Sequence, residues 1–139
     1  MLESLEVERV LHCGDIGSPA IVPLFSAWPT HFVFGNVDYD AAQLREAIES
    51  NGQTCHDEFG SIELSQRRIA LLHGDDTSRL RDVSCSGSWD LVCYGHTHVA
   101  RQFREGPTLL VNPGAIYRAN PHSIAVVDLS NLTATSIVI

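Results

Sequence analysis

Two histidines separated by one threonine, in the sequence GHTH, follow an apolar run at residues 91–94. His96 and His98 belong to a set of polar residues that come directly after apolar runs and beside glycines. The other members of the set are Asp15 in CGDIG, Asn36 and Asp38 in FGNVD, and His73 in LLHGD. Carboxylate, amide and imidazole groups together are the oxygen and nitrogen ligands that suit a divalent transition metal such as Mn, Fe or Zn. These residue types therefore predict a metal centre.

Each of these residues also has a simpler interpretation. Asp15 could cap a turn or the following helix, Asn36 could form an Asx turn, and His73 could be a hydrogen-bonded core histidine. His96 and His98 could be ordinary loop residues. Because four such features occur together, each beside a glycine at the end of an apolar run, a shared site is favoured over separate coincidences.

An alternation of short apolar runs and amphipathic stretches has to position these side chains. In the first two thirds of the chain, strands are expected at residues 7–13, 30–34, near 54, at 61–64, 68–73 and 89–94. Helices are expected at about 18–27, from the Asp40 cap to Asn51-Gly52, and from 76 or 77 to about 83. The last third predicts strands at 99–104, 108–112, 123–129 and 133–139, joined by turns with no room for crossover helices. The pattern favours an α/β layer architecture in which a mixed sheet gives way to an antiparallel one.

The candidate residues occupy equivalent positions on this map. Each one comes just after the carboxyl end of an expected strand. In layered α/β folds ligands bind in the crevice outside the carboxyl ends of the strands, where loops bring together residues that are distant in sequence. The sequence therefore predicts that these side chains meet at one edge of the molecule.

Length and composition are those of one domain that covers residues 1–139. The chain has 139 residues and 44% hydrophobic residues, and no apolar run approaches the roughly 20 residues of a membrane helix. The start, MLESLEVERV, carries acids where a secretory signal would carry basic residues. The four cysteines show no CxxC spacing, so we expect reduced thiols and no disulfides. Together with the missing signal and the absence of a membrane helix, this predicts a cytoplasmic location and no membrane partner.

The charge pattern argues against an extended nucleic-acid-binding surface. The formal net charge is −8, and all nine basic residues are arginines that are scattered along the chain, with only Arg67 and Arg68 adjacent. Phosphate contacts to a nucleic acid need clustered positive charge. A local acidic site that binds cations fits this composition better.

In this order and spacing, the motifs GD, GN, HG and GHTH resemble the calcineurin-like metallophosphoesterases, and most of all their small, single-domain phosphodiesterase branch. The VNPGA at 111–115 is similar to the NPG turn that follows GHTH in that family. The resemblance covers nearly the whole chain. It implies a four-layer α-β-β-α sandwich of the α/β class and a metal-activated hydroxide that hydrolyses a phosphodiester or another small phosphorylated compound.

The resemblance also implies a role for each residue. Asp15 matches a ligand that bridges two metals, and His98 matches a ligand of the first metal. Asn36, His73 and His96 match the ligands of the second metal, for which Mn, Fe, Zn and Ni are candidates. Asp38 is expected to act with His98 in catalysis, as the proton donor to the leaving group, although a helix cap or a turn is an equally good interpretation of this acid.

One departure from the family pattern changes these expectations. The family normally opens with a strand that ends in Asp-x-His and completes the first metal site, whereas here MLESLE resembles the end of the helix that follows that strand. We therefore expect a chain that is N-terminally truncated relative to the family, with its first strand missing. One metal should be retained, the second is doubtful, and activity should be impaired. A non-catalytic scaffold or interaction protein on the same fold is the alternative.

Two smaller expectations complete the sequence analysis. The missing strand would leave the strand at 7–13 with an unpaired edge, which invites self-association into a homo-oligomer. Arg118, shortly after the NPG turn, could meet a substrate phosphate or could be a solvated surface group.

Overall fold

Ten strands, two α-helices and two 3₁₀ helices form the fold in a computed structural model that describes residues 1–139. In chain order they are η1 (Leu2–Leu5), β1 (Val10–His12), η2 (Pro19–Phe25), β2 (Thr30–Phe32), α1 (Ala41–Ser50), β3 (Thr54–Cys55), β4 (Phe59–Leu64), β5 (Arg67–Leu72), α2 (Thr77–Cys85), β6 (Leu91–Cys93), β7 (Arg101–Glu105), β8 (Thr108–Asn112), β9 (Ser123–Asp128) and β10 (Thr133–Val138).

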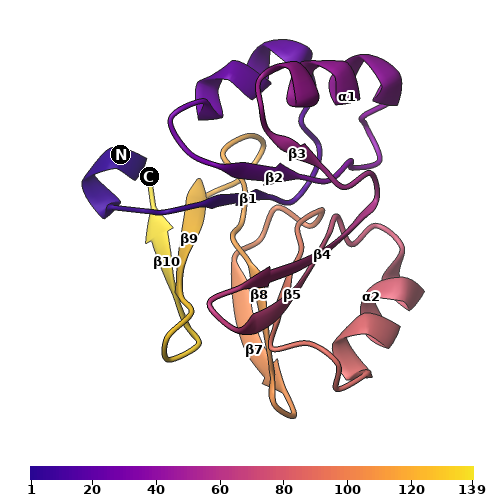
Figure 1. The fold of residues 1–139 in the computed structure, drawn as a ribbon. Coiled ribbons are helices and arrows are strands. Elements are labelled where there is room, and N and C mark those ends of the chain that lie inside the picture. The colour runs from indigo at the N-terminus through magenta and orange to yellow at the C-terminus, as the bar shows by residue number, and fades with distance from the viewer.

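The strands form two sheets and a separate hairpin. The first sheet has the order β1-β2-β3 and is parallel. The second has the order β4-β5-β6-β8-β7, in which β5, β6 and β8 run parallel and the edge strands β4 and β7 run antiparallel to their neighbours. The hairpin β9–β10 pairs with neither sheet. Figure 1 shows α1 beyond the first sheet and α2 beside the second, so the helices lie on the outside.

Three apolar clusters hold these layers together. The first, which includes Phe32, Leu44 and Ile48, lies between the first sheet and the helices α1 and η2. The second lies between the two sheets, and the third lies between the second sheet and α2. Strand β5 shows how one strand serves two clusters, because Ile69 and Leu71 face the first sheet and the residues between and after them face α2. The four-layer α-β-β-α sandwich is therefore confirmed.

The helices begin where the sequence predicts. The Asp40 side chain accepts a hydrogen bond from the Gln43 N–H at 3.1 Å and starts α1. Asp76 caps α2 in the same way, through the Arg79 N–H at 3.0 Å. Ser18 caps η2, but this segment is a 3₁₀ helix that ends at Phe25 instead of a helix to residue 27. Pro23, inside the segment, lacks the N–H group that an α-helix would need at that position.

The strands that lead to the candidate residues are shorter than predicted. The expected strands at 7–13, 30–34 and 89–94 are reduced to β1, β2 and β6, each of three residues. β1 and β6 begin later than expected, at Val10 and Leu91, and all three strands end one or two residues before their expected ends. The strands of the last third pair antiparallel with one another, β7 with β8 and β9 with β10, but β8 also lies parallel to β6 and so belongs to the mixed sheet. The hairpin partner β7 provides the return path that a crossover helix provides elsewhere.

One edge of β1 is unpaired, as predicted. β1 pairs with β2 on one side and has no strand partner on the other, and β9 likewise pairs only with β10. Homo-oligomer formation through this edge stays a prediction. The four cysteines are free thiols. None of the helices has the length and apolar character needed to cross a lipid bilayer.

Candidate metal centre

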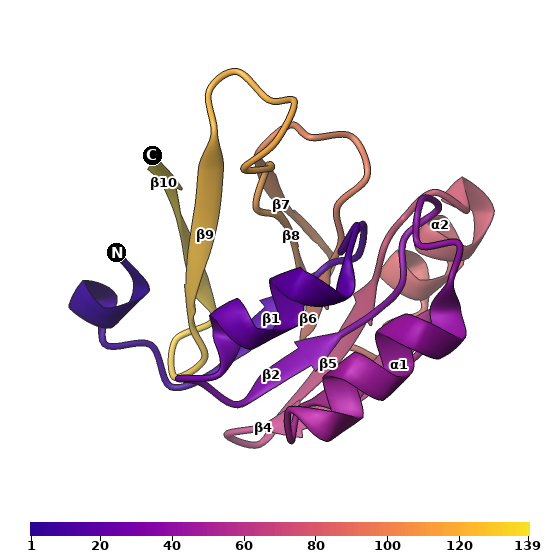
Figure 2. The ribbon, with the colours of Figure 1, turned by 90° about the horizontal axis from the view of Figure 1, so that it is seen from above.

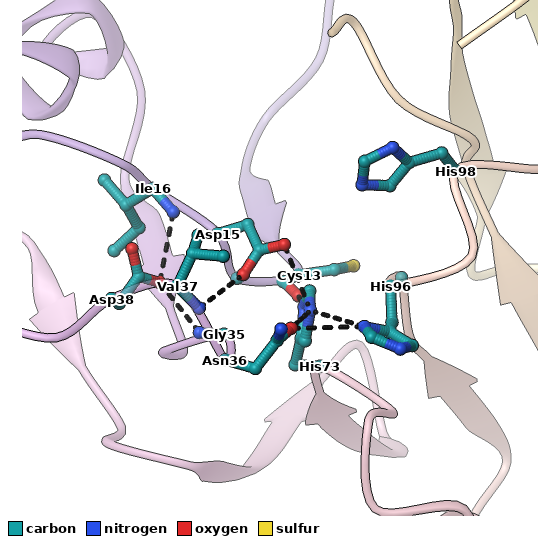
Figure 3. A network of polar contacts seen from close by, with 12 residues as sticks. Cys13, Asp15, Ile16, Gly35, Asn36, Val37, Asp38, His73, His96 and His98 are labelled. Carbon is teal, nitrogen blue, oxygen red and sulfur yellow. Dashed lines mark hydrogen bonds and ion pairs between the residues drawn. The ribbon is translucent and has the colours of Figure 1, made fainter. Parts of the chain in front are cut away.

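Four loops meet at the carboxyl ends of strands from both sheets, and each contributes one polar side chain. Asp15 follows β1, Asn36 follows β2, His73 follows β5 and His96 follows β6. Figure 3 shows these four side chains directed toward one another. The prediction that turns at strand ends bring them together is therefore confirmed for this part of the set.

The polar atoms of the four side chains lie within contact distance of one another around the buried ring of His73. His73 Nε2 lies 3.3 Å from Asp15 Oδ2 and 2.9 Å from Asn36 Oδ1. His96 Nδ1 lies 3.2 Å from the same Asn36 oxygen and 3.3 Å from His73 Nε2. His73 is only 4% exposed, whereas His96 lies at the surface, so the cluster opens to solvent on the His96 side.

The hydrogen bond on the other side of His73 determines which atoms face the cluster. His73 Nδ1 lies 2.8 Å from the main-chain oxygen of Cys13, a geometry in which Nδ1 carries the proton and donates. In the neutral ring Nε2 then presents a lone pair to two acceptor oxygens and to another imidazole nitrogen. In the tautomer of His96 that carries its proton on Nε2, several lone pairs converge without a donor between them, and a cation stabilises such an arrangement. This protonation pattern is the one required of a metal-binding histidine.

The distances between the donor atoms fit ligation of one ion. Ligand atoms at roughly 2.0–2.2 Å from a transition metal lie about 3 Å from their neighbours in the coordination shell, and the four contacts here span 2.9–3.3 Å. His, Cys, Asp and Glu residues alone form no group of three that could hold a metal. The amide oxygen of Asn36, which contacts both His73 and His96, is therefore needed to complete the donor set.

Two glycines allow the loops after β1 and β2 to approach. A Cβ on Gly14 would lie 2.7 Å from His73 Nδ1 and 2.9 Å from the Gly35 nitrogen. A Cβ on Gly35 would collide with the Asp15 carboxylate and with the main-chain nitrogen of Asp15. The glycines of GD and GN are thus required because the two backbones pack against each other.

The backbone at the site is held in an unusual conformation. Asp15 has φ of 54°, His96 has φ of 70° and His98 has φ of 60°, all in the left-handed region. Non-glycine residues rarely adopt this conformation, and such strain is concentrated at functional sites. At Asp15 and His96 this conformation accompanies side chains that point into the cluster.

His98 stands apart from the other predicted ligands. Its Nδ1 lies 3.3 Å from the main-chain oxygen of Arg118, and it makes no contact with Asp15, Asn36, His73 or His96. Figure 3 shows the ring on the far side of the opening from Asp15. Its predicted role at a first metal stays a prediction.

Asp38 occupies a different position from the one expected of a proton donor. It is 8% exposed, and its two carboxylate oxygens accept hydrogen bonds from the N–H groups of Ile16 at 3.1 Å, Gly17 at 2.9 Å and Gly35 at 2.7 Å. Asp38 therefore ties the loop that carries Asp15 to the loop that carries Asn36. Of the two interpretations left open by the sequence, this geometry favours the turn acid, and proton donation stays a prediction.

The substitution Asp38→Asn is expected to destabilise the protein by about 2 kcal/mol, because hydrogen bonds to a charged group are each worth about 1.5–3 kcal/mol. The amide NH₂ of the new asparagine would also face a main-chain N–H group, so that two donors would meet. Urea unfolding measures the change, with Asp75→Asn at an exposed acid as the control. Unchanged stability together with a rate loss that disappears for a good leaving group would instead assign Asp38 to proton donation.

His12 was not among the predicted site residues, although it supports the site. Its Nδ1 accepts the Gly14 N–H at 3.3 Å, and its ring stacks on Phe32 and meets Phe25 edge to face. Burial lowers the pKa of His12 to about 4, so the ring is neutral and can accept this bond at neutral pH. The sequence signal was its place in LHCGD, three residues before Asp15 on a strand whose alternate side chains face the helices.

A second histidine pair lies outside the cluster, on the side of the first sheet that faces away from α1. His31 Nδ1 and His56 Nε2 are 2.8 Å apart, and the rings stack at 5.1 Å. Burial, His56 and Arg9 together lower the pKa of His31 to about 4, and burial also lowers the pKa of His56 against the nearby Asp57.

This pair predicts a loss of stability in mild acid. In the unfolded chain His31 titrates near 6.5, so between about pH 6.5 and 4 the unfolded state binds the extra proton and the free energy of unfolding falls as the pH falls. Above pH 6.5 there is no such contribution. His31→Gln should reduce the loss between pH 7.5 and 5 by at most about 1 kcal/mol, since His31 is half exposed. Urea titrations at both pH values measure it, with exposed His122→Gln as the control. If His31→Gln and His122→Gln lost the same free energy of unfolding between pH 7.5 and 5, the prediction would be contradicted.

Comparisons with known proteins bear on this geometry. The model of the calcineurin-like phosphoesterase superfamily domain matches residues 1–132. The chain is 35% identical over 112 residues to a phosphodiesterase of Methanocaldococcus jannaschii, a match that covers 78% of this chain and 67% of the relative. It is 30% identical over 118 residues to a protein of Methanothermobacter thermautotrophicus named as a probable metallophosphoesterase, with 79% of this chain and 61% of that protein covered.

Among solved structures, one of an archaeal phosphodiesterase superposes with a TM-score of 0.91 at 28% identity, and the match covers 99% of this chain and 87% of that one. The chain thus spans about two thirds of the length of the two curated relatives. The similarity includes all four loops of the cluster, because the matches extend over most of residues 1–139.

Proposed function

The chain belongs to the calcineurin-like phosphoesterase superfamily, and from that premise we propose that it hydrolyses a phosphodiester or another small phosphorylated compound with a divalent metal bound by Asp15, Asn36, His73 and His96. The family depends on divalent metals. The observation that supports this site most directly is the convergence of acceptor atoms on His73 Nε2, which has its proton held on the opposite nitrogen.

Each residue of the cluster has a separable task in this proposal. Asp15 accepts the Val37 N–H on Oδ1 at 3.3 Å, which leaves Oδ2 directed at the cluster. The Cys13 carbonyl fixes the tautomer and the orientation of His73. His96 closes the cluster at the solvent-exposed end, where a phosphate group can approach. A bound divalent ion would neutralise charge on the phosphoryl oxygens and lower the pKa of water toward neutral pH.

For a second ion, residues 1–139 supply fewer donors. Apart from the shared Asp15, the family resemblance assigns only His98, which stands apart from the cluster. We therefore propose that these residues bind one ion well. Because the loss of one electrostatic stabiliser costs roughly 10²–10³ in rate, their hydrolytic activity should be low for the family.

The test uses the purified chain loaded with Mn²⁺. Bis(p-nitrophenyl) phosphate should be hydrolysed slowly, chelation should abolish the reaction, and elemental analysis should find close to one ion per chain. Two tightly bound ions with fast turnover would contradict the proposal for the second site. A chain that binds the ion and hydrolyses no phosphate ester would favour the alternative function of a scaffold or interaction protein.

A further inference from the structure

Exposed apolar side chains gather on the loops around the metal cluster. The protein exposes nine large hydrophobic residues. Five of them lie on the three loops that flank the cluster, and these are Val37, Tyr39, Val99, Ile116 and Tyr117. The other four lie at the chain termini or on η2. Surface hydrophobic residues are normally scattered singly, so a concentration beside a polar reaction site calls for a ligand with an apolar part.

Tyr117 is the aromatic member of this group whose loop contacts His98, the remaining predicted ligand. The main-chain oxygen of the next residue, Arg118, lies 3.3 Å from Nδ1 of His98. The guanidinium carbon of Arg118 lies 5.2 Å from the centre of the Tyr117 ring. Tyr117 itself is 68% exposed, and Arg118 forms no ion pair. An exposed aromatic ring and a positive charge that forms no ion pair therefore stand together on the loop that contacts His98.

The loop that carries Tyr117 is clamped at its base. The Asn112 amide donates to the Gly95 oxygen at 3.0 Å and to the Thr97 hydroxyl at 3.0 Å, and so joins the end of β8 to the GHTH loop. The Ser123 hydroxyl donates to the Pro113 oxygen at 2.8 Å at the other end of the loop. Figure 2 shows this loop, between β8 and β9, on one side of the molecule, with the loop between β2 and α1 on the other. The loop that carries Tyr117 is thus anchored at both of its ends.

From these contacts we infer that Tyr117 determines substrate specificity by stacking on a flat aromatic ring in the group of the phosphodiester that is not the leaving group. The inference rests on the proposed function and names the substrate class of that same site. An aromatic side chain binds any flat ring through its face, and a neighbouring arginine suits a ligand that also carries a phosphate negative charge. A ligand with one anionic and one aromatic part matches the two features on this loop.

Tyr39 provides a matched control on the opposite loop. It is 88% exposed and follows Asp38, but no hydrogen bond or ring contact joins its side chain to the cluster or to its flanking loops. Tyr117→Ala and Tyr39→Ala remove the same side chain from exposed positions, so neither should alter the fold. A difference between the two variants then reports the position of Tyr117.

The experiment compares two esters with the same leaving group, phenyl p-nitrophenyl phosphate and methyl p-nitrophenyl phosphate, on the Mn²⁺-loaded protein. The ratio of kcat/KM for the phenyl over the methyl ester should be at least about fivefold, the lower end of base–aromatic stacking. Tyr117→Ala should bring the ratio close to one with the methyl ester rate unchanged, and Tyr39→Ala should leave the ratio as it was. A wild-type ratio near one, or a ratio unaffected by Tyr117→Ala, would overturn the inference.

A binding measurement separates this inference from the proposed function. Calorimetry with phenylphosphonate and methylphosphonate requires no turnover. If neither ester is hydrolysed but Tyr117→Ala selectively weakens phenylphosphonate, the hydrolytic activity fails and the aromatic specificity stands. Equal binding of both phosphonates would overturn the inference. So would sedimentation that reveals a dimer which Tyr117→Ala dissociates, because the exposed ring would then serve contact between copies of this chain.

Discussion

His96→Ala is expected to remove the bound metal from an intact fold. His96 contributes the nitrogen that closes the cluster, 3.2 Å from Asn36 Oδ1 and 3.3 Å from His73 Nε2. Loss of an outer-shell partner of a metal ligand typically weakens metal binding by 10–100-fold, so loss of a ligand itself should weaken it by more than about 100-fold. Hydrolysis should fall by roughly 10²–10³ or more, because charge on the phosphoryl oxygens is no longer neutralised.

The surface position of His96 makes this substitution a clean measurement. His96 is exposed and packs in none of the apolar clusters, so the unfolding midpoint of the metal-free protein should stay the same. Metal titration by calorimetry and elemental analysis after dialysis measure the binding. The matched control is His122→Ala, an exposed histidine whose side chain makes none of these contacts. Metal content equal to that of the wild type would exclude His96 as a ligand.

Gly35→Ala is expected to have the largest effect on stability among single methyl additions at the site. The added Cβ would meet the carboxylate of Asp15, with Cγ at 2.8 Å, and the main-chain nitrogen of Asp15. A side-chain tip could rotate away, but the main-chain nitrogen can move only if the whole loop after β1 shifts. We expect a loss of about 3 kcal/mol, the upper end of ordinary overpacking, together with weaker metal binding because Asp15 is displaced.

Gly95→Ala is the control for this collision. Gly95 comes just before His96 at the end of another strand, and like Gly35 it does not have a positive φ. Its added Cβ would make only an ordinary contact with Cys13 Cβ at 3.4 Å. Chemical unfolding of both variants measures the difference, and for Gly95→Ala the free energy of unfolding should change by less than about 1 kcal/mol. Similar stability of the two variants would mean that the backbones around Gly35 can separate, contrary to the close packing described above.

Sequence patterns were most reliable where one local interaction decides the structure. The caps at Asp40 and Asp76 each satisfy a main-chain N–H within three residues, so the starts of α1 and α2 could be predicted from sequence alone. Strand ends were less predictable. The runs at 7–13, 30–34 and 89–94 are mostly apolar with a few polar residues, and their composition does not indicate that each ladder has only three residues.

The same distinction applies to the candidate site. Asp15, Asn36, His73 and His96 were identified because each follows an apolar run and lies beside a glycine, and the structure places them together. The role of Asp38 could not be decided in this way. Its three main-chain partners include Ile16 and Gly17, which lie more than twenty residues earlier, in the loop after β1. The support that His12 gives to the turn at Gly14 was missed for a similar reason, since burial against Phe25 and Phe32 is a tertiary contact.

By itself the sequence determined which residues could act as metal ligands, the order of the elements and the family resemblance, because these depend on residue type and on neighbours along the chain. Only the tertiary structure decided which acceptor atoms face one another, that His98 stands apart, and that Asp38 joins two loops. These depend on distances between segments as far apart as Cys13 and His73, and such distances are set by how two sheets pack across one apolar layer.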